Sequence, residues 1–167
     1  MNTHPNFVER LPVAALETSV RSAMLRAAWR DWLTGERRLI DLVPYENAAI
    51  LADGHSIDGA PPKLRHIGPA APAVKIFGET WRKAVNAGNA PRLPAHDFDE
   101  VLSKDYFDAA DHEPKLSEAA YTFVHDGRRI RVCFERLIVP VHMPGFKWWF
   151  LVSLIEDIER PRIDPLH

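Results

Sequence analysis

The sequence predicts an α+β fold, in which an antiparallel sheet of five strands carries short helices on one face and a separate helix stands near the N-terminus. Three observations predict it. Apolar residues recur at helical spacing between residues 13 and 33, two strand-like runs flank a Gly- and Pro-rich loop between residues 48 and 68, and the last third of the chain is rich in β-branched and aromatic residues. Strands from both parts of this order can form one sheet with the intervening helices packed on it.

The N-terminal region is expected to be a flexible arm followed by one helix. Residues 1–12 show no periodic pattern, whereas residues 13–35 hold good helix formers and no Pro or Gly before Gly35. Leu16 and Val20 begin an apolar stripe along this helix. Gly35 can adopt the left-handed conformation that ends a helix.

The main domain is expected over residues 36–156. It starts with strands at 48–53 and 63–68, followed by helical turns interrupted near Gly78. A further helix is predicted to start at Asp97, which suits an N-cap with Glu100 three residues later.

A three-stranded antiparallel meander is expected to close the domain. Its strands are predicted at 121–125, 129–141 and 147–155. Asp126-Gly127 between the first two is a strong hairpin signal. The charged, Pro-containing residues 157–167 are expected to be a solvated tail.

The last predicted strand is apolar on both faces. Trp148, Phe150 and Leu154 would point one way, and Trp149 and Leu151 the other. An antiparallel sheet with one solvated face shows a simpler alternation, so both faces must be covered. The helix at 13–35 is the expected cover of the second face.

Composition restricts the classes of function. The chain has 167 residues, 46% of them hydrophobic and 26% charged, with a formal net charge of −2, as in ordinary soluble proteins. There is no basic excess for nucleic acid, no apolar run long enough for a membrane span, and no apolar N-terminal segment of the kind that directs secretion. The single Cys133 excludes an internal disulfide and fits a cytoplasmic protein.

Three stretches carry a family resemblance: LRAAWRDWL (25–33), LRHIGPAAPAVKIFG (64–78) and ERLIVPV (135–141). With the order of the elements, they resemble the short stand-alone PAS-like proteins of proteobacteria over roughly residues 20–156. The resemblance implies a non-enzymatic sensory or regulatory domain. Such a domain can hold a small molecule between sheet and helices and signals through a homodimer or a partner protein.

The resemblance leaves the cofactor open. PAS photoreceptors that form a flavin adduct carry a cysteine in a helical N-C-R-F-L motif, whereas Cys133 lies in a predicted strand. Haem-binding members use a helical histidine, but neither His96 nor His112 lies in a recognisable motif. The histidines are scattered without metal-ligand spacing, so no metal site and no catalytic residue are expected.

Candidate ligand-binding residues are mainly aromatic side chains that could line a cavity between helices and sheet, although such residues are more often plain core. They are Phe77, Trp81, Tyr106, Phe134, Arg136 and Trp149. Strict alternation places Arg136 on an apolar face with Phe134. A buried, unpaired arginine is costly, so a β-bulge, a structural ion pair or a ligand contact is expected there.

An association surface is expected from Trp29, Trp32, Trp148 and Phe150. The same fold without a ligand would be a dimerisation module. An alternative from another class is a small cone-shaped α+β barrel that acts on, or binds, apolar carbonyl compounds. That class needs an Asp or His at the base of a deep pocket, for which the candidates are Asp99, Asp105 and His112.

Overall fold

The computed structural model describes residues 5–55, 59–109 and 113–166, and its strands form one antiparallel sheet. Six strands in this part of the chain lie in the order β1-β4-β5-β6-β2-β3. They are β1 (Phe7–Leu11), β2 (Ala49–Asp53), β3 (Leu64–Ile67), β4 (Lys115–His125), β5 (Arg128–Val141) and β6 (Phe150–Pro165).

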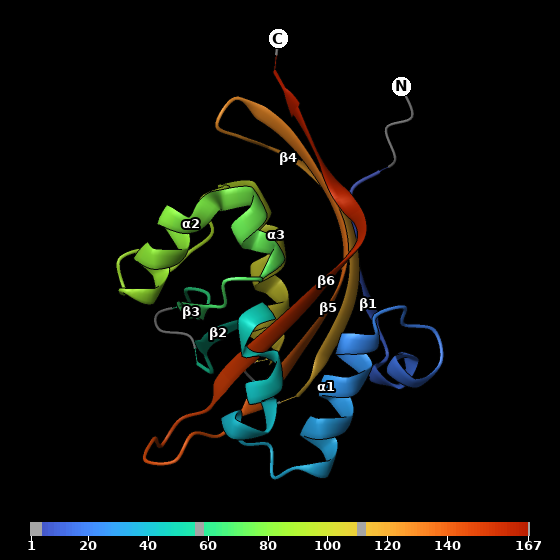
Figure 1. Ribbon diagram of the computed structural model, residues 1–167, viewed down its shortest axis with the longest axis vertical. Helices are drawn as coiled ribbons and strands as arrows, with labels where there is room; N and C mark the ends of the chain where they lie inside the picture. Colours follow the sequence, from blue (N-terminus) through green and yellow to red (C-terminus); the bar gives the residue numbers. More distant parts are fainter. Residues whose placement is uncertain (1–4, 56–58, 110–112, 167) are drawn as a thin grey trace.

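Helices lie on both sides of this curved sheet. They are the 3₁₀-helices η1 (Val13–Glu17) and η2 (Leu39–Ala48) and the α-helices α1 (Ala23–Thr34), α2 (Pro72–Asn86) and α3 (His96–Ala109). Figure 1 shows α2 and α3 on the concave side of the sheet and α1 on the other side. The predicted α+β class is therefore confirmed.

The strand count was underestimated, because β1 was expected to be part of an arm. β1 pairs with β4 along its whole length, from Phe7 opposite Ala120 to Leu11 opposite Leu116. None of its residues is buried, so it has no apolar alternation by which it could be recognised.

The expected tail at 157–167 is instead a continuation of β6 through Pro165. Arg162 and Pro165 pair with Arg131 and Arg128 of β5. The register shifts between Arg131 and Phe134, as in a β-bulge. Backbone pairing holds this polar segment in the sheet, and charge and Pro content did not indicate it.

The expected continuous N-terminal helix is interrupted between η1 and α1. Ser22 caps α1, and its Oγ accepts from Leu25 N at 3.1 Å. The buried Glu135 of β5 accepts from the backbone N–H groups of Arg21 at 2.9 Å and Ser22 at 3.0 Å. This carboxylate satisfies donors at the start of the helix, so α1 begins where the sheet provides the acceptor.

Two local predictions are confirmed. The helical segment α2 is kinked at Gly78, whose φ of 87° lies in a region that L-residues avoid. Asp126 and Gly127 have φ of 48° and 67°, as a type I′ hairpin turn requires. The helix α3 begins at His96, one residue before the predicted cap at Asp97.

Both faces of β5 and β6 are covered by the chain itself over residues 137–141 and 150–154. On one face, Leu137, Val139, Val141, Val152 and Leu154 pack in one cluster with Leu25, Trp29 and Trp32 of α1. On the other, Ile138 and Leu151 pack in a cluster with Trp81 of α2 and Tyr106 of α3. The helix at the N-terminus thus covers the second face, as its sequence predicted.

Candidate functional site

A small cavity lies between the concave face of the sheet and the helices α2 and α3. Its free volume is about 40 Å³. Its lining is mostly apolar, with two arginines, two aspartates, a serine and a tyrosine among the wall residues. They are Ile50, Leu64, Pro72, Ala73, Ile76, Phe77, Arg92, Leu93, Phe98, Asp99, Leu102, Ser103, Tyr106, Val132, Phe134, Arg136, Ile155 and Asp157.

Aromatic rings line part of this cavity and pack behind its lining. Phe98 of α3 stacks on Phe123 of β4 with ring centroids 4.4 Å apart. Phe77, at the kink of α2, meets Phe123 at 6.2 Å and Trp81 edge-on at 5.3 Å. Phe77 is only partly buried, so its side chain lies between the cavity and the surface.

Arg136 of β5 brings a cation into this apolar environment. The residue is 1% exposed, and its Nη2 donates to Asp105 Oδ2 at 2.6 Å. Its Nη1 donates to Leu102 O at 3.3 Å, and its guanidinium lies 5.6 Å from the ring centroid of Tyr106. Its Nε has no hydrogen-bond acceptor among the residues that the structure describes.

Asp105 of α3 joins Arg136 to the N-terminal strand. Its Oδ1 accepts from Nη2 of Arg10 at 3.0 Å, and Arg10 also pairs with Asp108. Burial alone would raise the pKa of Asp105, but the charge of Arg136 and the hydrogen bonds from Arg10, Arg136 and Ser117 outweigh it. The pKa of Asp105 is therefore lowered, and its carboxylate is ionised at neutral pH.

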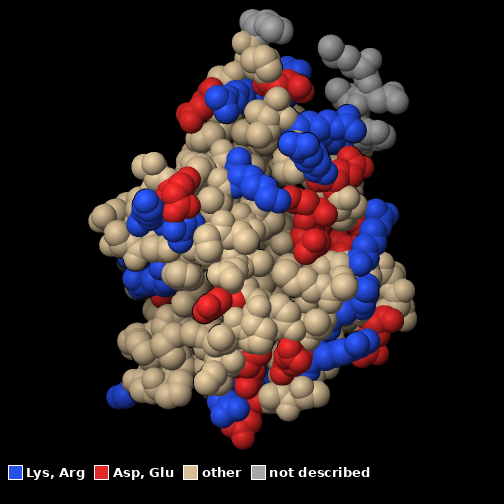
Figure 2. Space-filling view, in the orientation of Figure 1, with Lys and Arg blue, Asp and Glu red and all other residues tan. Residues whose placement is uncertain are grey.

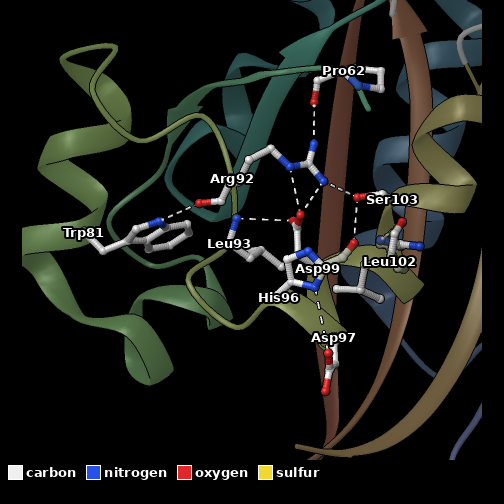
Figure 3. Close-up of polar contacts among 10 residues, drawn as sticks. Pro62, Trp81, Arg92, Leu93, His96, Asp97, Asp99, Leu102 and Ser103 are labelled. Carbon is white, nitrogen blue, oxygen red and sulfur yellow. Dashed lines mark hydrogen bonds and ion pairs between the residues drawn. The ribbon is translucent and has the colours of Figure 1, made fainter. Parts of the chain in front are cut away.

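A second ion pair fixes the loop before α3 to that helix (Figure 3). Nε of Arg92 donates to Asp99 Oδ2 at 2.8 Å, and Nη1 donates to Pro62 O at 3.1 Å. Arg92 also bonds to Ser103, whose hydroxyl donates to Asp99 O at 2.6 Å. The carbonyl of Arg92 accepts from the indole of Trp81 at 3.1 Å, so this cluster ties α2, α3 and the loop together.

Two other polar groups of the wall have raised pKa values. Burial raises the pKa of Tyr106, against the opposing charge of Arg136, so its phenol stays protonated. Burial also raises the pKa of Asp157, which lies 3.6 Å from the exposed Lys75. Within the described wall, each arginine carries a carboxylate partner, so the ionic groups largely neutralise one another.

Four of the six sequence-predicted ligand residues come together in the lining: Phe77, Tyr106, Phe134 and Arg136. Trp81 is buried behind Phe77 and outside the lining. Trp149 lies away from the cavity, before β6, with its ring on His142. For Arg136 the ion pair is realised, and the register shift of β5 lies earlier in the strand, at residues 131–134.

Sequence reasoning missed Arg92, Ser103 and Asp157. Arg92 belongs to a loop without periodicity, and Asp157 to the segment expected to be a tail. The only sequence signal was the carboxylate of Asp99, one of the candidates for a pocket floor. The pairing of Asp99 with Arg92 could not be predicted from the spacing of residues in the sequence.

The expected association surface is mostly interior. Trp29, Trp32 and Phe150 are buried in the cluster between α1 and the sheet, where the indole of Trp32 donates to Pro140 O at 2.8 Å. Trp148 alone of the four is exposed, at 47%. Trp148 precedes β6 and contacts Phe146, which is also 47% exposed, in the loop between β5 and β6.

The other candidate groups are placed as follows. Asp99 and Asp105 are both paired with arginines, and His112 lies outside the described residues. Cys133 is absent from the lining of the cavity, and burial raises its pKa. Among the described residues, no three His, Cys, Asp or Glu side chains are grouped to hold a metal ion.

The charged surface has no dominant sign. Figure 2 shows Lys and Arg side chains interspersed with Asp and Glu over the visible face. No helix in the described part of the chain combines the length and the apolar character needed to cross a bilayer. No protein-family model matches the chain, and no curated protein matches it significantly.

Proposed function

We propose that this chain is a non-enzymatic sensory or regulatory domain of PAS-like type, which binds a small molecule between the sheet and α2–α3. The observation that carries the proposal is the cavity there, with its apolar wall and converging polar groups. Pockets of this composition are the usual place for a small ligand. The order of elements on which the resemblance rests, two strands, helices and a three-stranded meander, also supports it.

Binding can alter output only if the ligand prefers one of two conformations. The ion pairs beside the cavity connect it to the N-terminal strand, because Asp105 pairs with Arg136 and also with Arg10 of β1. A ligand that alters the Arg136–Asp105 pair therefore alters how firmly Arg10 and β1 are bound to α3. A second copy of the chain or another protein then binds the altered surface. The single cysteine and the ordinary composition favour a cytoplasmic location.

The proposal is tested by thermal melting with a panel of small molecules. Ala73→Val, on the cavity wall, fills the free volume, whereas Ala84→Val makes the same change in the same helix away from the cavity. We expect some molecules to raise the melting temperature of the wild type and of Ala84→Val, but not of Ala73→Val. Equal responses in all three proteins would contradict binding in this cavity.

The alternative, a barrel-type enzyme or binder of apolar carbonyl compounds, requires a free acid or base at the floor of a large pocket. The cavity is only about 40 Å³, and the carboxylates of Asp99 and Asp105 are held by Arg92 and Arg136. No observation on the described residues favours a barrel-type enzyme, because neither carboxylate is free to act as an acid or base.

A further inference from the structure

Arg136 lines the cavity, and its buried guanidinium leaves one donor unused. Its Nη2 and Nη1 donate to Asp105 and Leu102, but no described residue accepts from Nε. A buried N–H group without a partner destabilises the protein, because its lost hydrogen bond to water is not replaced. An oxygen acceptor of a bound molecule would recover that free energy.

The neighbours of Arg136 on the sheet are mostly apolar. Ile155 is directly opposite on β6, and Phe134 and Ile138 are the flanking residues of the same face of β5. Ser117, opposite Arg136 on β4, is polar, but its hydroxyl already bonds to Asp105. A well-held buried water needs two to four polar partners, roughly. A ligand that offers one acceptor and is otherwise apolar suits this part of the wall better.

Charge decides against an ionic ligand. Asp105, whose pKa is lowered, remains a carboxylate and neutralises Arg136, and Asp99 neutralises Arg92. A bound anion would be desolvated without a free cation to receive it, which is costly in an apolar site. A bound cation would be repelled by Arg92 and Arg136.

Size sets the last limit. The free volume of about 40 Å³ is well below the roughly 150 Å³ of an engineered cavity that accepts benzene. A molecule of more than a few heavy atoms therefore requires Phe77, which is only partly buried, to move outward.

From these four observations we infer that the cavity selects a small, uncharged, largely apolar molecule with one acceptor oxygen, which binds the Nε–H group of Arg136. This inference rests on the proposed function and names the chemical class of its ligand. The acceptor oxygen would belong to a ketone, aldehyde, ester or ether group.

Three probes with the same heavy-atom skeleton separate the possibilities: 2-butanone, 2-methyl-1-butene and propanoate. The readout is the Nε–Hε cross-peak of Arg136 in the ¹⁵N-labelled full chain, assigned with Arg136→Lys. We expect 2-butanone to shift this peak and to bind about tenfold or more tightly than either other probe, as one hydrogen bond implies. Ala73→Val should abolish the shift, and Ala84→Val should retain it.

Three results would overturn the inference. Equal affinities for the ketone and the hydrocarbon, with no shift of the Hε peak, would show that the cavity selects ligands by shape and not by a hydrogen bond to Arg136. Tightest binding by propanoate would make it an anion site. Absence of binding by all three probes would reject this ligand class, while the panel of small molecules still decides the proposed function separately.

Discussion

Glu135 and Arg136 are adjacent on β5, and their side chains hold two helices against opposite faces of the sheet. Glu135 accepts from the backbone of Arg21 and Ser22 at the start of α1, and Arg136 pairs with Asp105 of α3 at 2.6 Å. Both side chains are buried. One strand therefore joins the cavity side of the molecule to the helix that covers the other face.

Glu135→Ala is expected to loosen α1. The substitution removes the charged acceptor of two backbone N–H groups, the buried one of Ser22 and the part-buried one of Arg21, at a cost of about 1–3 kcal/mol. Hydrogen exchange should accelerate in residues 21–34, and the free energy of unfolding should fall. Glu156→Gln changes an exposed carboxylate opposite Glu135 on β6 and serves as the control. Equal exchange of α1 in both variants would contradict the capping role.

Arg136→Met is expected to destabilise the protein by about 3 kcal/mol, because it leaves the largely buried carboxylate of Asp105 with the half-exposed Arg10 as its one remaining arginine partner among the described residues. The double variant Arg136→Met with Asp105→Leu removes both charges and should recover part of this loss, although Arg10 then loses one partner. Urea unfolding measures the three free energies. No recovery in the double variant would show that the cost of Arg136→Met is not a stranded charge.

Acid pH should distinguish Asp105 from Asp157. The pKa of Asp105 is lowered on folding, so its carboxylate stabilises the protein above pH about 4, and this contribution disappears as the pH falls below that value. Asp105→Asn should therefore be less stable than the wild type at pH 7, with a difference that shrinks toward pH 3.

Asp157 provides the matched control with the opposite sign. Burial raises its pKa, so its charge costs stability at neutral pH, and the cost vanishes as it becomes protonated. Asp157→Asn should gain stability at pH 7 and lose the gain in acid. Unfolding curves at several pH values check both signs, and a shared sign at pH 7 would contradict these assignments.

Phe146→Ser with Trp148→Ser tests whether the loop between β5 and β6 contributes to protein contact. Both side chains are exposed, so the free energy of unfolding should change by only about 0.5 kcal/mol. Sedimentation at several concentrations should show weaker self-association than in the wild type. Val124→Ser, at an exposed apolar site near the end of β4, is the control. Unchanged association would exclude this loop from the contact.

The sequence predicted the elements that have a strong local signal. The Asp126-Gly127 turn, the kink at Gly78 and the cover of both faces of β5 and β6 are local chemistry or simple periodicity. β1 and the end of β6 were not predicted, because β1 is short and unburied, the end of β6 is charged, and both are held by backbone pairing with distant strands.

The candidate site was predictable only in part. The shared face of Phe134 and Arg136 follows from alternation along β5, whereas Phe77 and Tyr106 follow from helical spacing in α2 and α3. Its partner Asp105 is 31 residues earlier in the chain, and Arg10 reaches Asp105 across 95 residues. No spacing rule joins residues so far apart, so the cluster of ion pairs emerges only from the packing of α3 and β1 on the sheet.

Native mass spectrometry of the freshly purified chain tests the central claim most directly. We predict a population that carries one non-covalently bound, uncharged small molecule, which denaturation releases and Ala73→Val lacks. Spectra in which the wild type and Ala73→Val both show only the mass of the chain would contradict the claim that the cavity between the sheet and α2–α3 holds a ligand.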